Sequence, residues 1–369
     1  MMTMGQGNHA TNRPGRGLRP ARCLMLLTAI MGMMWLPCFA AVQSTVLRTI
    51  EFYGLQKVSE ASVRQALQIT EGEKLPNSGE AADAMEKRLR ALPGVEDAKL
   101  NAVCCVAGKT VLFVGIEEKG AHPLRFRAAP KGKVRLPAKV VQAGDEFDKA
   151  LEAAVKEGDA GEDDSQGYSL MNNAAARAVQ QRFLIFASLD SSPYQDVLLH
   201  SSDETHRALA AQILGYADPK DQSVVNDLVT GVSDPDATVR NNAMRALAVR
   251  ALAEQKNPQS EVKIPYEPFA RLLNSLDWTD RNKACFALLQ LSEKHDPAFF
   301  KSLRKEALPA LKEMARWTKS GYGQPAFIIL GRMNGLSDAA ILKAWQEEDY
   351  EKVIGSDAGG SKASQTAPR

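Results

Sequence analysis

Few side chains in this chain of 369 residues stand at spacings that could carry chemistry. Glu117 and Glu118 form an adjacent pair of carboxyl groups, but neighbours on a strand point to opposite faces. We therefore expect them to be the solvated end of a strand and not a general acid and base. Four acids crowd residues 159–164, yet the alternate-residue ligand spacing of a calcium-binding loop is missing, which favours an exposed hinge.

The cysteines and histidines form no nucleophilic or metal-binding set. Beyond residue 40 the cysteines are Cys104, Cys105 and Cys285, and a bond between the adjacent two would be strained, which favours buried thiols. The motifs of serine hydrolases, phosphate-binding loops, zinc proteases and paired-cysteine sites are absent. The sequence therefore predicts no catalytic, metal-binding or cofactor-binding residues and a protein that is not an enzyme. An enzyme with an unrecognised site is the alternative.

One pattern, Asp-x3-Arg-x2-Ala-x3-Leu, occurs three times in the second half of the chain. Its copies are Asp203, Arg207, Ala210 and Leu214; Asp236, Arg240, Ala243 and Leu247; and Asp277, Arg281, Ala284 and Leu288. The arginines are 33 and then 41 residues apart, a period typical of helical repeat arrays. Such arrays mostly act as binding surfaces, so the pattern favours a binding protein.

The four offsets of this pattern fall within about 60° of one another on a helix of 3.6 residues per turn. We expect each aspartate to cap the helix that follows it. The alanine permits a neighbouring helix to approach closely, and the leucine fills the space between repeats. The arginine lies at the edge of this stripe, where its stem can pack and its head can bond to a turn.

Residues 232–247, with the sequence VSDPDATVRNNAMRAL, closely resemble a HEAT repeat of the armadillo type. In that family an aspartate six residues before the arginine often joins a ladder of hydrogen bonds, and Asp234 fits this position. The other two copies have Ser201 and Ser275 there, so we expect the local turn and not a continuous ladder. An irregular helical bundle is the alternative fold, and the HEAT-like phycobilin lyases are an alternative family for which no cofactor pocket is evident.

The resemblance implies an all-α, HEAT-like solenoid over residues 169–350. Its first helix, 169–187, is either a divergent repeat or a polar cap, and residues 351–369 are expected to be a disordered tail. Trp278 and Trp317 fall at repeat junctions, where they either pack in the core or serve as partner-binding residues. The other expected helices span 194–199, 222–231, 267–276, 301–317, 324–333 and 338–349.

Residues 45–120 have the pattern of a small α+β domain. Expected strands at 46–52, 95–105 and 110–117 enclose helices at 60–67 and 79–92, with Gly108 in the turn of the closing hairpin. Both faces of the last strand are apolar. One face must pack on the two helices, and the other can be covered as well.

This domain resembles a polypeptide-transport-associated (POTRA) domain. The resemblance lies in Arg48–Leu55 followed by Val58 and Ser59, in Leu89-x2-Leu92-Pro93-Gly94-Val95-Glu96-x-Ala98, and in the closing strand 111–118. It implies a place in the bacterial envelope and docking of proteins by addition of a strand to an exposed sheet edge. No β-barrel sequence and no series of such domains follows, so insertion or secretion through a barrel is not implied. A generic α+β domain is the alternative.

The N-terminus has the sequence of a secretory signal peptide, residues 1–40. Four arginines and no acid precede an apolar run at 23–39, and small Ala40 closes it. We expect an exported protein, periplasmic or secreted; retention of residues 23–39 as an inner-membrane anchor is the alternative. Of the 46 basic and 44 acidic residues, only four basic ones lie in residues 1–40, so the remainder is near neutral and predicts no nucleic-acid binding.

Residues 121–168 are expected to be a connector with one helix at 144–156. Its basic stretch is interpreted as a solvated linker, with an anionic lipid or an acidic partner as alternatives. The stretch comprises Arg125, Arg127, Lys131, Lys133, Arg135 and Lys139. The sequence thus predicts a multidomain, non-catalytic scaffold that binds envelope proteins through its helical surface and its sheet edge. A membrane-anchored structural subunit is a further alternative.

Overall fold

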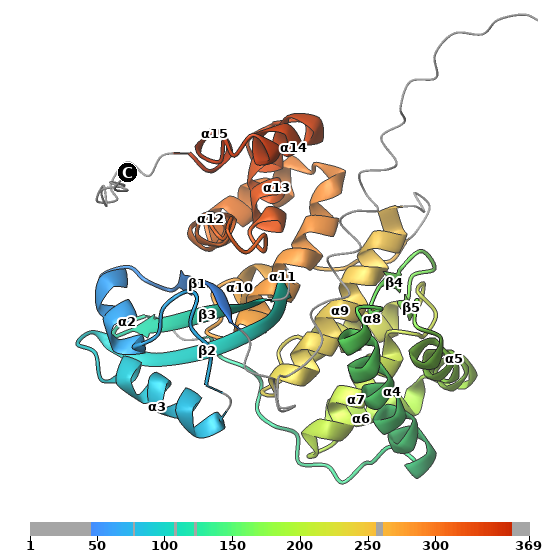
Figure 1. Ribbon diagram of the computed structural model, residues 1–369. Helices are drawn as coiled ribbons and strands as arrows, with labels where there is room; N and C mark the ends of the chain where they lie inside the picture. The colour runs from blue at the N-terminus through green and yellow to red at the C-terminus, as the bar shows by residue number, and fades with distance from the viewer. Residues whose placement is uncertain (1–45, 77, 107–108, 122–123, 256–260, 356–369) are drawn as a thin grey trace, which may run out of the picture.

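The computed structural model describes residues 46–76, 78–106, 109–121, 124–255 and 261–355. The predicted signal peptide, its anchor segment and residues 356–369 lie outside the described residues, as do the side chains of Cys104 and Cys105. Within the described residues the chain is mostly helical, with fourteen α-helices and a small three-stranded sheet near the N-terminus (Figure 1). No described helix combines the length and the apolar character needed to cross a bilayer.

The sheet domain contains two helices and three strands in the predicted order. They are β1 (Leu47–Tyr53), α2 (Glu60–Leu67), α3 (Gly79–Arg90), β2 (Val95–Val106) and β3 (Lys109–Glu118). The strand order is β1-β3-β2, in which β1 runs parallel to β3 and β2 runs antiparallel to it. Ser59 and Ser78 cap the two helices through their side chains, which confirms the predicted cap at Ser59.

The two faces of β3 lie in two different cores. Leu112, Val114 and Ile116 pack under α2 and α3 with Val63 and Leu89. The alternate residues of β3 face the helical part of the molecule, because successive side chains of a strand point to opposite sides. Tyr53, Val103, Val111 and Phe113 accordingly belong to the core of that helical part.

Phe113 is the centre of this contact between the sheet domain and the helices. Its ring stacks on Trp278 at 4.6 Å and meets the edges of Trp317 at 5.1 Å and Tyr322 at 5.4 Å. In Figure 1 the sheet lies against α10 and α11. The apolar character of both faces of β3 therefore reflects two layers of helices, one within the sheet domain and one from the rest of the chain.

The helical part follows a connector and ends near residue 354. Its elements are α4 (Ala138–Glu157), β4 (Glu162–Asp163), β5 (Leu170–Met171), α5 (Ala174–Leu189), α6 (Ser192–His200), α7 (Glu204–Leu214), α8 (Gln222–Gly231), α9 (Ala237–Gln255), α10 (Glu267–Leu272), α11 (Trp278–Leu291), α12 (Pro297–Ala315), α13 (Gln324–Met333), α14 (Asp338–Gln346) and α15 (Glu351–Ile354). The helix α4 begins six residues before its predicted start at 144. The prediction of a tail is wrong for residues 351–354, which form α15 and bury Val353 and Ile354 in the core.

Helices α6 to α13 pack as successive pairs, and the second helices of the pairs also contact one another. The alanine and leucine of the repeated pattern lie at these contacts and are fully buried. They are Ala210, Ala243 and Ala284 with Leu214, Leu247 and Leu288. Small residues at the crossing points let the helices approach closely, as the pattern predicts.

The connector is bound along the helices and is not a solvated linker. The amide of Arg127 donates to the carbonyl of Ser233. Gly132 donates its amide to the His200 carbonyl and accepts the Ser202 amide at its own carbonyl. Arg127 and Arg135 form ion pairs with Asp234 and Asp203 respectively. The prediction of a solvated basic stretch is wrong for Arg127, whose side chain is 20% exposed, whereas Arg135 is paired but remains 54% exposed.

Replacement of Phe113 by alanine should loosen the contact between the sheet domain and the helices. Loss of a buried phenylalanine side chain costs about 3–5 kcal/mol of unfolding free energy. Because Phe113 covers Trp278 and Trp317, the native tryptophan emission should also shift to the red. Leu112→Ala, on the other face of the same strand, should lower stability in urea unfolding without that shift. Unchanged emission in Phe113→Ala would contradict this role of Phe113.

Candidate functional site

The three arginines of the repeated pattern are buried, with exposed fractions of 2%, 1% and 5% for Arg207, Arg240 and Arg281. Each guanidinium group donates to the backbone carbonyl six residues before it. These carbonyls belong to Ser201 at 3.0 Å, Asp234 at 2.9 Å and Ser275 at 2.6 Å. The predicted bond from each arginine to its local turn is confirmed.

The aspartates of the pattern do not all behave alike. Asp203 and Asp236 cap their helices by accepting two backbone amides each, as predicted. Asp277 makes no such cap. Its carboxylate instead pairs with Lys99 of β2 and with Arg240, 3.0 Å away. The prediction of a cap at Asp277 is therefore wrong, because two cations compete for the same oxygens.

Each buried arginine also pairs with a carboxylate of the next helical pair. Arg207 binds Asp234 through two hydrogen bonds of 2.9 Å. Arg240 binds Asp280 at 2.8–3.0 Å, and Arg281 binds Glu313 at 2.8 Å. We call these three contacts the arginine–carboxylate series. As expected, only Asp234 stands six residues before an arginine, but acids at other positions continue the series.

The series continues because each arginine finds its carboxylate at a different position relative to the repeated pattern. Where Asp234 has a carboxylate, the equivalent Ser275 has a hydroxyl, and this hydroxyl donates to Asp280 at 2.7 Å. Asp280 follows Asp277 by one helical turn, and Glu313 lies on α12. The repeated pattern did not include either acid. A search of the sequence for any acid within one helical turn of each arginine would have found Asp280. Glu313 lies on another helix, so only the tertiary structure shows that it is a partner.

The protonation of these carboxylates differs along the series. Burial opposes ionisation of Asp234, but hydrogen bonds from Arg207, the Asp236 amide and Arg127 outweigh it and lower its pKa. Burial raises the pKa of both Asp280 and Glu313 despite their arginine partners.

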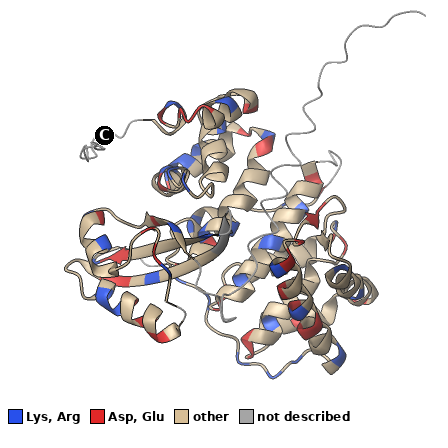
Figure 2. Cartoon of the chain, in the orientation of Figure 1, with Lys and Arg blue, Asp and Glu red and all other residues tan. Residues whose placement is uncertain are grey.

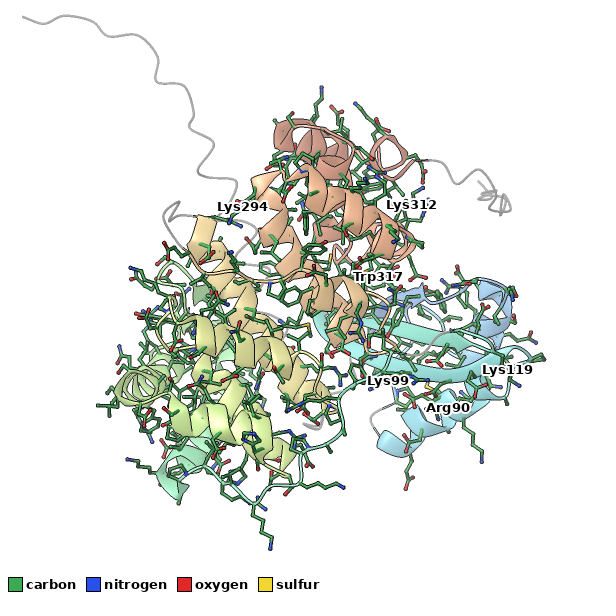
Figure 3. The ribbon with its side chains drawn as sticks, turned by 180° about the vertical axis from the view of Figure 1, so that it is seen from behind. Arg90, Lys99, Lys119, Lys294, Lys312 and Trp317 are labelled. Carbon is green, nitrogen blue, oxygen red and sulfur yellow. The ribbon has the colours of Figure 1, made fainter. Side chains whose placement is uncertain are left out.

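The series ends on the sheet domain. Glu313 accepts a hydrogen bond from the Gly54 amide at 2.7 Å, and the Arg281 guanidinium lies 4.5 Å from the centre of the Tyr53 ring. The Tyr53 hydroxyl donates to the Leu276 carbonyl at 2.7 Å. The Trp317 indole donates to the Phe52 carbonyl at 3.2 Å. Figure 3 shows Trp317 and Lys99 at this junction.

The two tryptophans singled out in the sequence are placed at the same junction. Trp278 and Trp317 are 3% and 2% exposed, and both rings pack on Phe113. Their contacts are thus with the sheet domain of the same chain. Neither side chain is presented at the molecular surface as a partner-binding residue would be.

The outer edge of β1 is occupied. Leu47 bonds to the backbone of residues 72 and 73, and the Ile50 amide donates to Glu71 at 3.4 Å. Further along, Phe52 and Gly54 bond to Trp317 and Glu313 of the helical part. A peptide strand could not add to this edge without displacing these groups.

The outer edge of β2 is blocked by two side chains from α3. Glu86 accepts the Leu100 amide at 2.9 Å, and Arg90 donates to the Ala98 carbonyl at 3.0 Å. The two side chains also form an ion pair of 2.7 Å. Charged side chains over an edge strand are a common protection against unwanted strand pairing. The expectation of an open sheet edge does not hold at these positions.

Glu118 anchors the loop that follows β1. Its carboxylate accepts the amides of Gln56, Lys57 and Val58 at 2.7–2.8 Å. Burial opposes its ionisation, but these three hydrogen bonds outweigh it and lower its pKa. The residue is 8% exposed, so the prediction that Glu118 is a solvated strand end is wrong.

A second buried charged cluster lies where the loop 158–172 covers α9 and α11. Glu162 pairs with Arg245, and Asp164 accepts the Ser169 hydroxyl. Burial and the nearby Arg245 lower the pKa of Lys283 to about 8. The expectation of an exposed acidic hinge is wrong for Glu162 and Asp164, whose side chains are buried, whereas Asp159 and Asp163 are exposed.

A lysine with a lowered pKa beside acids is the kind of group that catalytic sites employ. The hollow next to this cluster, however, has room for about one water molecule. It is lined by Ser169, Gln212, Gly215, Tyr216, Asn242, Arg245, Ala246 and Val249. The cluster therefore connects the loop to the helices and offers no space for a substrate.

The second helices of the pairs, in particular α9 and α11, are covered on several sides. Asn242, Arg245 and Lys283 project from α9 and α11 and are at most 9% exposed. The loop 158–172 covers one region of these helices, and the sheet domain covers another at Trp278. A broad concave surface on the second helices, expected for an open array, is filled by the chain itself.

Charge and metal-ligand geometry add no further site. Figure 2 shows basic and acidic residues interspersed over both the sheet domain and the helices. Within the described residues, no group of three or more His, Cys, Asp or Glu side chains is arranged to hold a metal ion. Cys285 is a buried free thiol whose pKa is raised by burial. Comparison with protein-family models and with curated protein sequences gives no match.

Replacement of Asp280 by alanine should be strongly destabilising. It leaves the Arg240 guanidinium buried without its main partner, which costs about 3–5 kcal/mol of unfolding free energy in urea titrations. Ser275→Ala removes one hydrogen bond to Asp280 and should cost about 1 kcal/mol. Asp196→Ala, which removes an exposed pair with His200, should cost less than about 1 kcal/mol. Equal costs for Asp280→Ala and Asp196→Ala would contradict the proposed importance of the series.

The carboxyl group of Glu51 should make stability depend on pH. Burial raises its pKa to about 7, against hydrogen bonds from Ser320 that lower it. A raised pKa means that Glu51 binds its proton more tightly in the folded state than in the unfolded state. The ionised carboxylate therefore lowers the free energy of unfolding above pH 7. This loss disappears as the pH falls to about 4.5. Glu51→Gln should be about 2–3 kcal/mol more stable than the parent at pH 8 and equal to it near pH 4.5.

Urea unfolding of both chains from pH 4.5 to pH 8 measures this difference. Glu152→Gln on α4, where the side chain is 38% exposed, serves as the control and should give a curve parallel to the parent. A Glu51→Gln curve that is also parallel to the parent would show that the pKa of Glu51 is the same in the folded and unfolded states.

Proposed function

We propose that this chain is a non-catalytic adaptor that binds other proteins in a bacterial cell envelope. In this proposal the sheet domain is POTRA-like and the helical part is a HEAT-like array. The strand order β1-β3-β2 and the stacked helix pairs with buried alanine and leucine support the two resemblances. The envelope location rests on the sequence of residues 1–40, which lie outside the described residues.

The observation that carries the proposal is that the buried arginines join neighbouring helix pairs. Arg207, Arg240 and Arg281 bind carboxylates of the next helix pair, and each also donates to a carbonyl of its own turn. Groups arranged in this way fix the relative positions of helices. A catalytic site instead gathers such groups around a space that a substrate can enter. The arrangement therefore favours a rigid binding scaffold over an enzyme.

The outward face of α12 is the best candidate for the binding surface. Both sheet edges and the inner helices are engaged within the chain, whereas Lys301, Arg304 and Lys305 on α12 are exposed. Lys301 and Lys305 are one turn apart, where like charges repel each other. An acidic surface on a partner protein would relieve this repulsion. We therefore infer that the partner presents carboxylates to α12.

Site-specific photo-crosslinking in cells of the source organism tests the proposal. A photoreactive residue in place of Lys305 should give discrete adducts with one or a few envelope proteins. The same residue in place of Lys149, which is exposed on α4, is the matched control and should give none of these adducts. The double variant Lys301→Glu and Lys305→Glu should reduce the adducts at least tenfold. Recovery of uncrosslinked monomer from probes on α8, α10 and α12 alike would argue against an adaptor.

A further inference from the structure

The outer face of α5 carries the large hydrophobic side chains that remain exposed in the described residues. Ile185 is 56% exposed and Leu189 is 79% exposed. They stand one helical turn apart, and Ala174 and Ala178 are exposed on the same stripe. In Figure 1, α5 lies at the outside of the helical part, on the side away from the sheet domain.

This face departs from the rule that the ends of helical arrays are polar. The opposite end follows the rule, because Lys343 of α14, Glu347 directly after α14 and Glu351 of α15 are exposed. The helix α5 has no acidic residue, and its Arg182 is directed to Glu146 of α4. Of the two alternatives for this first helix, a divergent repeat or a polar cap, the polar cap does not fit this exposed apolar face. An exposed apolar face at the end of a helical array is a candidate contact surface.

We propose that the outer face of α5 is the contact between two copies of this chain, packed antiparallel about a twofold axis. With the axis between Gln181 and Arg182, Leu189 lies over Ala174 of the other copy and Ile185 lies over its Ala178. Each large side chain thus meets a small one, and the match occurs twice by symmetry. A twofold contact needs such a self-complementary surface.

The helical geometry places these side chains in register. Residues 174, 178, 185 and 189 fall within about 60° of one another around the helix, so they form one stripe. Gln181 and Arg182 meet at the axis, where an amide faces a guanidinium that Glu146 already neutralises. Since α5 has no carboxylate, no pair of acids is brought together across the contact.

The size of the stripe sets the expected strength of the dimer. A helix of 16 residues is about 24 Å long, so one such stripe buries a few hundred Å² per copy. Stable dimers bury about 800 Å² per copy. The contact is therefore expected to be weak, with a dissociation constant on the order of 10 µM.

Sedimentation equilibrium of the chain from Ala41 onward, between about 1 and 200 µM, tests the proposal. This chain contains every described residue. The mass should rise from monomer toward dimer over this range, and Leu189→Glu should weaken association at least tenfold. Because Leu189 is 79% exposed, this variant should keep its fold, which circular dichroism checks. Ala339→Glu on α14, also at an exposed alanine, is the matched control and should associate like the parent.

Disulfide crosslinking tests the antiparallel arrangement. The double variant Ala174→Cys and Leu189→Cys should form a crosslinked dimer, with the bond mapped between positions 174 and 189. Leu189→Cys alone should not, because the two copies of this residue would lie at opposite ends of the contact, about 22 Å apart along the helix. Crosslinking of Leu189→Cys alone, or a monomer up to 200 µM, would overturn the proposal. Binding of the monomer to phosphatidylglycerol vesicles that is lost in Leu189→Glu would also overturn it, and would assign the face to lipid.

Discussion

The buried guanidinium group of Arg240 constrains the structure more than any other single group. It is 1% exposed, and it binds Asp280, Asp277 and two carbonyls of the turn before α9. An ionised group in a protein interior costs several kcal/mol unless partners of good geometry surround it. The turn before α9 and the first turn of α11 must therefore keep one relative position. Arg207 and Arg281 impose the same condition on the neighbouring helix pairs.

The last member of the arginine–carboxylate series connects two parts of the molecule. Glu313 accepts hydrogen bonds from Arg281 and from the Gly54 amide, so it belongs both to the helices and to the sheet domain. Phe113 adds an aromatic contact with Trp278 and Trp317 beside it. Polar and apolar contacts thus fix the same junction. The sheet domain and the helical part consequently behave as one unit and not as two modules on a flexible linker.

This packing decides which surfaces remain for partners. The groups that a sheet edge or an open array would offer are occupied by Glu86, Arg90, Trp317 and the loop 158–172. Among the surfaces of the described residues that stay exposed are the outward face of α12 and the apolar face of α5. A scaffold of this type would act through its outer surface, while its inner surface serves its own stability.

The sequence by itself determined the elements and their local chemistry. The helices 60–67, 222–231 and 324–333 were predicted at their observed bounds, and the bonds from Arg207, Arg240 and Arg281 to their own turns followed from spacing within one helix. Only the tertiary structure decided the partners of these groups. Asp280 supplies the carboxylate that is missing at Ser275. Glu313, the partner of Arg281, lies 32 residues further along the chain on another helix. The reason is physical: spacing along one helix fixes which side chains share a face, whereas the partner of a buried charge is set by which other helix packs against that face.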